Sequence, residues 1–224
     1  MTEQARAMEL IARLRQCYPD AKCSLDFTSP LELLIATILA AQCTDKRVNQ
    51  VTASLFKKYH VAQDYASASL QQLEQDLKQI NFYRNKTKNV QATCALLVQR
   101  YGGQVPQTMP ELLALPGVAR KTANVVLGNA YGHVEGVIVD THVGRISRRL
   151  SLTNSDDPLR AEQDLMKTIP RQDWLDFTHL LIYHGRAVCQ ARKALCNQCT
   201  LIDLCPTGSA AVVPAAATED RASE

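Results

Sequence analysis

Two residues near the middle of the chain carry side chains that could act on a nucleic-acid backbone. Lys121 directly follows segment 115–120, whose Pro and Gly are typical of a tight turn between two helices, and Asp140 lies beyond the second helix. A neutral amine is a nucleophile, and a carboxylate stabilises a positive charge that develops on a sugar. A turn that leads into a helix N-terminus also presents backbone N–H groups to a phosphate. This combination points to chemistry on a nucleic-acid backbone.

Both residues also have a simpler interpretation. A lone lysine at such a turn can serve only as a phosphate contact. Asp140 comes just before a predicted helix and is first of all a candidate N-cap. Its two roles are compatible, because capping N–H groups keep a carboxylate ionised.

A helix-hairpin-helix over residues 108–130 is expected to position Lys121. Thr108 begins the first, short helix, which has Pro and Glu in its first turn. Gly117 permits the tight turn, and Lys121 is expected one turn inside the second helix. The backbone N–H groups expected to hold the phosphate belong to Val118, Ala119 and Arg120.

Apolar residues at helical spacing predict that the whole fold is all-α. Ser29, followed three residues later by Glu32, opens a helix that is apolar nearly all round and is expected to be buried. Thr44 and Asp157 begin further helices, and apolar spacings of three and four predict another that ends near Asn81. We find no convincing strand and no internal repeat.

The charge distribution favours a nucleic-acid partner without resembling that of a histone. The net charge is only +3 over 224 residues. Three basic groups could nonetheless follow a phosphate backbone: Lys78, Arg84, Lys86, Lys88 and Arg100; Arg145, Arg148 and Arg149; and Arg186, Arg192 and Lys193. The first helix shows no export signal, and the longest apolar run, residues 31–41, is too short to span a membrane. We expect a cytoplasmic protein without a membrane partner.

Four of the eight cysteines crowd into one short segment. Cys189, Cys196, Cys199 and Cys205 have the spacing C-x6-C-x2-C-x5-C. A zinc site with four cysteines usually has two C-x2-C pairs. One such pair with wider outer gaps favours a [4Fe–4S] cluster. Zinc and four unligated thiols remain as alternatives.

The hairpin followed by Lys121, the Val-Asp-Thr-His of residues 139–142 and the cysteine spacing together resemble the endonuclease III family, the base-excision DNA glycosylases with AP-lyase activity. The resemblance extends from about residue 22 to residue 205. Adenine-mismatch glycosylases share the cysteine loop but lack a lysine at this position. The resemblance implies two helical lobes that flank a DNA-binding cleft. They are a six-helix barrel domain at 29–135 and an iron–sulfur domain made of 1–28 plus 136–205. Ala, Pro, Ser and acidic residues dominate residues 206–224, which have almost no large apolar groups, and this composition predicts a disordered tail.

The resemblance also implies a reaction on damaged double-stranded DNA. Lys121 would form a Schiff base with the sugar of an oxidised pyrimidine nucleotide, and β-elimination would nick the strand 3′ to the abasic site. Asp140 would support the cationic sugar, and the [4Fe–4S] cluster would hold a DNA-positioning loop. The protein is expected to be a monomer associated with the nucleoid.

Extrusion of a base from the helix leaves a gap that side chains must fill. Gln42 matches the family's gap-filling glutamine, although a glutamine at a helix end is more often only solvated. Asn81 and Phe82 stand where the family usually has Gly then Leu in its wedge loop, so Phe82 is expected to be a bulkier wedge. Ala119 replaces a frequent glycine and leaves slightly less room for the phosphate. Asp45 and His142 match positions that lie near the DNA-binding cleft in the family, and we assign neither residue a chemical step.

Two other functions are compatible with parts of this pattern. The cysteines and basic groups alone suggest an iron–sulfur DNA-binding or redox module without enzyme activity. A monofunctional mismatch glycosylase would release a base without nicking, which Lys121 argues against.

Overall fold

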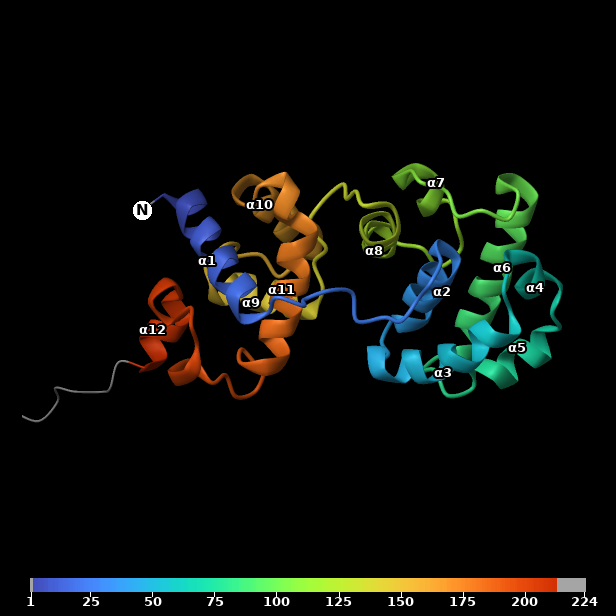
Figure 1. Cartoon of the computed structure of the whole chain (residues 1–224), viewed down its shortest axis with the longest axis horizontal. Coiled ribbons are helices and arrows are strands. Elements are labelled where there is room, and N and C mark those ends of the chain that lie inside the picture. The colour runs from blue at the N-terminus through green and yellow to red at the C-terminus, as the bar shows by residue number, and fades with distance from the viewer. Residues whose placement is uncertain (1, 213–224) are drawn as a thin grey trace, which may run out of the picture. The chain divides into compact units, whose positions relative to one another are not determined.

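The computed structural model describes residues 2–212, which divide into two compact units (Figure 1). One unit contains the described residues up to Lys22 and from Gly136 onwards, and the other is Cys23–Glu135. Every regular element in the described part of the chain is helical, which confirms the predicted all-α fold. None of the described helices has the length and apolar character needed to cross a bilayer.

The Cys23–Glu135 unit is built around one buried helix. Its elements are α2 (Pro30–Ala40), α3 (Asp45–Lys58), α4 (Ala62–Ser67), α5 (Leu70–Leu77), α6 (Tyr83–Tyr101), α7 (Met109–Leu113) and α8 (Arg120–Tyr131). The side chains from Leu33 to Leu39 of α2 are all buried, and α2 packs against α3, α6 and α8 (Figure 1). Ser29 caps α2 as predicted, because its hydroxyl accepts a hydrogen bond from the Glu32 N–H at 3.2 Å.

Segment 23–28 belongs to this unit, although the resemblance had grouped it with the other lobe. The Asp26 N–H donates to Oδ1 of Asn49 at 3.1 Å, and Nδ2 of Asn49 donates to the Ser24 carbonyl at 2.9 Å. Leu25 is buried in the same core. Side-chain bonds from α3 therefore fix where the chain enters the unit.

Two helical details differ from the sequence prediction. The short helix α4 was not predicted; the Asp64 carboxylate caps its start by accepting from the backbone N–H groups of His60 and Val61. The helix expected to end near Asn81 ends at Leu77. The apolar periodicity continues beyond it because Ile80 is buried in a turn, where its N–H donates to the Leu77 carbonyl at 2.9 Å.

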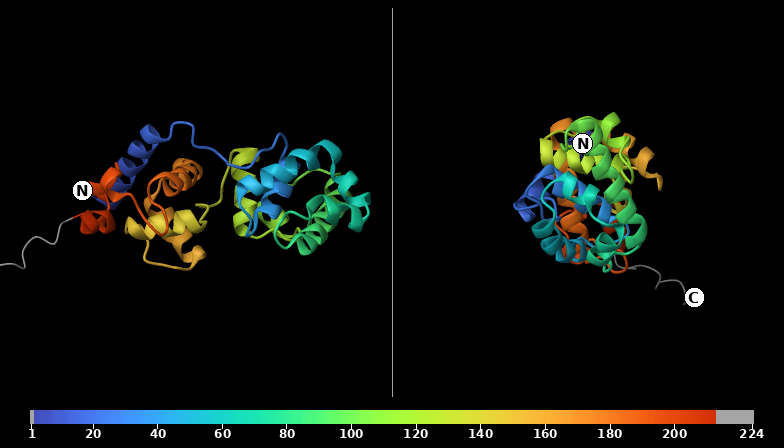
Figure 2. Two further views of the ribbon diagram at one scale, coloured as in Figure 1. Left: turned by 90° about the horizontal axis from the view of Figure 1, so that it is seen from below. Right: turned by 90° about the vertical axis from the view of Figure 1, so that its right-hand side faces the viewer.

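The other unit joins the beginning of the chain to its second half. Its α-helices are α1 (Glu3–Cys17), α9 (Thr141–Arg149), α10 (Pro158–Thr168), α11 (Trp174–Ala187) and α12 (Pro206–Val212). Helix α1, blue in Figure 2, belongs to the same unit as the C-terminal helices drawn in orange and red, and three of its arginines bind later segments. Arg6 donates to the carbonyls of Leu150 and Leu204, at 2.7 and 3.1 Å. Arg13 pairs with Asp203, and Arg15 pairs with Asp173 and Asp176.

Helix α12 corrects part of the predicted disordered tail. Residues 206–212 are helical, and the backbone N–H and hydroxyl of Ser209 donate to the carbonyls of Cys205 and Ile202 at 2.9 and 2.7 Å. These bonds hold the short helix, although it lacks the large apolar residues whose absence had predicted disorder. Residues 213–224, the rest of the predicted tail, lie outside the described residues.

Candidate active site

The hairpin between α7 and α8 forms where the sequence predicted it. Gly117 has a φ of +74°, and a Cβ there would lie 2.8 Å from Nδ2 of Asn89. Both the backbone conformation and the lack of space therefore require glycine. The turn is attached to α6, because the buried Thr93 hydroxyl donates to the Pro116 carbonyl at 2.7 Å. The hairpin thus rests on the longest helix of its unit.

One of the expected phosphate donors is used inside the turn. The Val118 N–H donates to the Leu115 carbonyl at 3.2 Å, and its side chain is only 7% exposed. Helix α8 begins at Arg120 with Ala119 as N-cap, and no side chain of the described residues caps it. The first N–H groups of a helix have no partner within the helix, so the possible anion site starts after Val118 rather than at it.

Lys121 is the second residue of α8 and is exposed. The sequence had placed it one turn inside the helix, but the helix starts only at Arg120. The Lys121 side chain therefore projects from the first turn of α8. This is the same turn that carries the backbone N–H groups without a side-chain cap.

Asp140 is the N-cap of α9. Its Oδ1 accepts a hydrogen bond from the Val143 N–H at 2.7 Å, and its carbonyl accepts from the Gly144 N–H at 2.9 Å. The N-cap interpretation is therefore confirmed. Within the described residues Oδ2 accepts no hydrogen bond, so the cap occupies one carboxylate oxygen and leaves the other for a further role.

Gln42 and Phe82 lie at two turns that one hydrogen bond joins. Gln42 follows α2 and Phe82 precedes α6, and both are exposed. Each has a left-handed backbone, with φ of +52° and +57°. The side chain of Asn81, next to Phe82, donates from Nδ2 to the Gln42 carbonyl at 2.9 Å. The two turns that carry the expected DNA-contacting side chains are therefore joined to each other by a hydrogen bond.

Lys86 is not part of a basic surface, contrary to its expected place in the first basic group. Its side chain is buried, and Nζ donates to the carbonyls of Leu39, at 2.8 Å, and Ala41, at 2.5 Å. Burial lowers the pKa of this ammonium group. Lys86 caps the C-terminal end of α2, just before the turn that carries Gln42.

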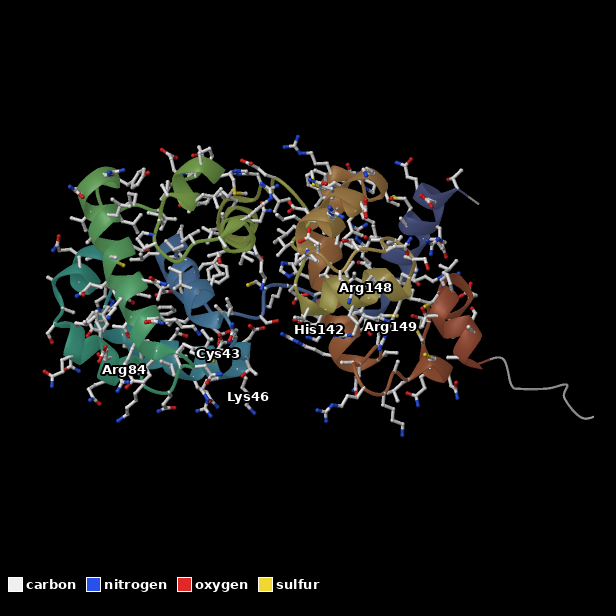
Figure 3. All side chains as sticks on the ribbon, turned by 180° about the vertical axis from the view of Figure 1, so that it is seen from behind. Cys43, Lys46, Arg84, His142, Arg148 and Arg149 are labelled. Carbon is white, nitrogen blue, oxygen red and sulfur yellow. The ribbon has the colours of Figure 1, made fainter. Side chains whose placement is uncertain are left out.

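The arginines of α9, of which Arg148 and Arg149 are labelled in Figure 3, bind other parts of the protein. Arg149 donates from Nη1 to Sγ of Cys189 at 3.2 Å and to the Gln190 carbonyl at 2.8 Å. Arg145 donates to the Cys189 carbonyl at 3.0 Å, and Arg148 pairs with Asp156 at 3.1 Å. Two members of the second basic group, Arg145 and Arg149, therefore hold the start of the cysteine segment, a role that their charge alone did not reveal.

The four clustered cysteines line one cavity of about 360 Å³, together with apolar side chains such as Ile146 and Leu201. His184, which is buried, places Nε2 3.6 Å from Sγ of Cys199, and its Nδ1 lies 3.1 Å from the Tyr18 hydroxyl. A single zinc ion needs thiolates about 4 Å apart, given Zn–S bonds of about 2.3 Å. In the described chain no three His, Cys, Asp or Glu side chains are grouped closely enough to hold one ion. Four thiols that line one cavity are a donor set that can bind a group with several cysteine ligands.

Comparison with known proteins assigns the chain to a family. The HhH-GPD superfamily of base excision DNA repair proteins matches residues 35–171. An endonuclease III from Synechocystis sp. is 54% identical over 209 residues, which are 93% of this chain and 95% of that relative. The chain belongs to the endonuclease III family.

Two solved structures of endonuclease III with DNA are similar to this member of the family. One is a non-covalent complex, with a TM-score of 0.88 and 45% identity over 94% of this chain and 98% of the other. The second is a trapped covalent intermediate with DNA, an estranged-adenine complex. It has the same TM-score and identity, over 94% of this chain and 99% of the other. The recognised family is confirmed.

Sequence patterns had pointed to most of the candidate site residues, but the roles of three others were missed. Asn81 had been noted only as a departure from the family, and Lys86 and Arg149 had been grouped with surface charges. Each one binds a backbone carbonyl that is distant in sequence. A local pattern contains no signal for such a partner.

Proposed function

We propose that this chain excises oxidised pyrimidines from double-stranded DNA and then nicks the strand 3′ to the abasic site, as a monomer at the cytoplasmic nucleoid. Membership of the endonuclease III family establishes the reaction class, a base-excision DNA glycosylase and lyase. The proposal adds the lesion class and the roles of named residues. The observation that carries it is the exposed Lys121 amine in the first turn of α8.

In the proposed reaction, neutral Nζ of Lys121 attacks C1′ of the damaged nucleotide. The C1′–N bond breaks, and the base leaves with the bonding electrons and takes up a proton. Opening of the sugar ring gives an imine between C1′ and Nζ. The imine acidifies C2′–H, so loss of that proton expels the 3′ phosphate with the electrons of the C3′–O bond. Water then releases the lysine.

Asp140 contributes the negative charge that the cationic sugar needs. The Val143 N–H bond to Oδ1 keeps this carboxylate oriented. A fixed charge stabilises a developing cation without reorganisation during the reaction.

Residues outside the chemical step position the DNA. The first turn of α8 binds a backbone phosphate. Gly117 makes the turn that leads into it, and Ala119 leaves slightly less room for the phosphate than a glycine would. Phe82, which is 65% exposed, wedges into the base stack, and Gln42 fills the gap left by the extruded base. Phe82 can stack on a neighbouring base through its ring.

The cavity of the cysteine segment holds a [4Fe–4S] cluster in this proposal, bound by Cys189, Cys196, Cys199 and Cys205. When bound, the cluster supplies one rigid attachment for four points of the chain. The exposed side chains of Arg192 and Lys193 lie on the same loop and contact phosphates. Arg149 supports this arrangement through its bond to Cys189.

A panel of labelled duplexes tests the function. We expect the purified protein to release the base and nick a duplex that contains an oxidised pyrimidine, and to nick one with a preformed abasic site. It should leave an undamaged duplex and an adenine mismatch intact. Separation on a denaturing gel, with and without alkali, distinguishes base release from nicking. Nicking only after alkali would indicate a monofunctional glycosylase, and binding without either reaction would indicate a non-enzymatic module.

Metal analysis tests the proposed cofactor. We expect about four iron and four acid-labile sulfide per chain in protein purified without oxygen, because a [4Fe–4S] cluster contains that many of each. Replacement of Cys199 with serine should lower both contents, whereas replacement of the exposed Cys17, outside the cavity, should leave them unchanged. One zinc per chain in place of iron would contradict the cluster.

A further inference from the structure

The turns that carry Gln42 and Phe82 have the same unusual backbone. Both residues are in the left-handed region, which residues with a side chain adopt only at an energetic cost. Surrounding contacts must therefore hold these turns. Cys43 and Arg84, labelled in Figure 3, mark where the two turns lie on their unit.

Two side chains, Asn81 just before α6 and Lys86 within it, bind backbone carbonyls at and just after the end of α2. Nζ of the buried Lys86 donates to the carbonyls of Leu39 and Ala41, which come just before the turn that carries Gln42. Asn81 is exposed and binds the Gln42 carbonyl itself at 2.9 Å. Lys86 therefore holds α6 against α2. The Asn81 bond instead joins the turn that carries Phe82 directly to Gln42.

We propose that Asn81 is a positioning residue that makes Gln42 and Phe82 enter DNA as a pair. This inference rests on the proposed function, in which Phe82 wedges the stack and Gln42 fills the gap. Extrusion of a base needs both side chains at a fixed separation, and a bond formed before binding reduces the ordering that binding must impose. The side chain of Asn81 supplies that bond, which a glycine at this position cannot make.

The isosteric replacement Asn81→Asp tests this role, since a carboxylate has the same shape but cannot donate to the Gln42 carbonyl. Fluorescence of 2-aminopurine next to the lesion reports unstacking, and single-turnover excision reports the reaction. We expect both the extruded fraction and the excision rate on a paired lesion to fall about 3- to 10-fold, the range for one lost hydrogen bond. Nicking of a preformed abasic site, which has no base to extrude, should change less than about 2-fold.

A matched control and a double-mutant cycle separate positioning from general weakening. Gln79 lies on the same turn and accepts a hydrogen bond from Arg47 at 3.1 Å. Gln79→Ala removes that bond without touching Gln42, and excision should stay within about 2-fold of the unmodified protein. In a Gln42→Ala background, Asn81→Asp should lose most of its effect, because the side chain that it positions is gone.

Three results would overturn the role of Asn81. They are excision by Asn81→Asp at the rate of the unmodified protein, an effect of the same size on the preformed abasic site, and full additivity with Gln42→Ala. Equal unfolding temperatures of the variants show that folding is not responsible. Failure of the unmodified protein to excise any lesion would instead refute the proposed function.

Discussion

Replacement of Lys121 with arginine is expected to abolish strand nicking and covalent trapping while duplex binding persists. Arginine keeps the positive charge for a phosphate contact, but its guanidinium stays protonated and cannot form the imine. The loss of nicking should be on the order of 10³-fold or more, equivalent to about 4 kcal/mol of transition-state stabilisation. Borohydride reduction of the imine on an abasic duplex, followed by a denaturing gel, measures the adduct directly.

The Lys121→Arg experiment distinguishes a nucleophile from a phosphate contact. Lys57 is an exposed lysine on α3, and Lys57→Arg serves as the matched control that should trap as efficiently as the unmodified protein. If Lys121→Arg still formed the adduct, another amine would be the nucleophile. If it lost duplex binding in proportion to nicking, Lys121 would be only a phosphate contact.

Replacement of Asp140 with asparagine is expected to lower base release by on the order of 10²- to 10³-fold with little effect on folding. Asparagine caps helices about as well as aspartate, so the bond from the Val143 N–H can persist. The charge that supports the cationic sugar is lost. Asp140→Ala removes the cap as well, and should lower the free energy of unfolding by a further ~1 kcal/mol. Single-turnover base release and chemical denaturation measure the two effects separately.

A second aspartate provides the control for the cap. Asp157 caps α10 in the same way, accepting from the Arg160 N–H at 2.9 Å. Asp157→Ala should cost about the same free energy of unfolding as the cap of Asp140 and should leave base release unchanged. Full base release by Asp140→Asn would show that Asp140 is a cap and nothing more.

Local signals predicted the elements that hold this site. Ser29, Asp140 and Asp157 were expected to be caps, and each accepts the N–H bond that a cap requires. Such bonds join residues three positions apart, so the sequence contains both partners. The Pro and Gly of the hairpin, with its φ of +74° at Gly117, are local in the same sense.

Interactions between distant segments could not be predicted in this way. Lys86 lies in a run of basic residues that looks solvated, yet its partners are carbonyls of α2. Arg149 looked like a phosphate contact, yet it binds the Cys189 segment. Backbone carbonyls carry no residue signature, so a charge that satisfies them resembles a surface charge until the fold is known.

The arginines of α1 have a consequence for the order in which the protein is made. Arg6 and Arg13 bind Leu204 and Asp203, so the first helix synthesised has its partners almost at the other end of the chain. The Cys23–Glu135 unit is one continuous segment with its own hydrophobic core, so it can form while the ribosome is still translating the second half of the chain. Helix α1 must wait for its partners to be made, and such long-range closure is slow. The half of the molecule with the cysteine cavity is therefore the last to be completed.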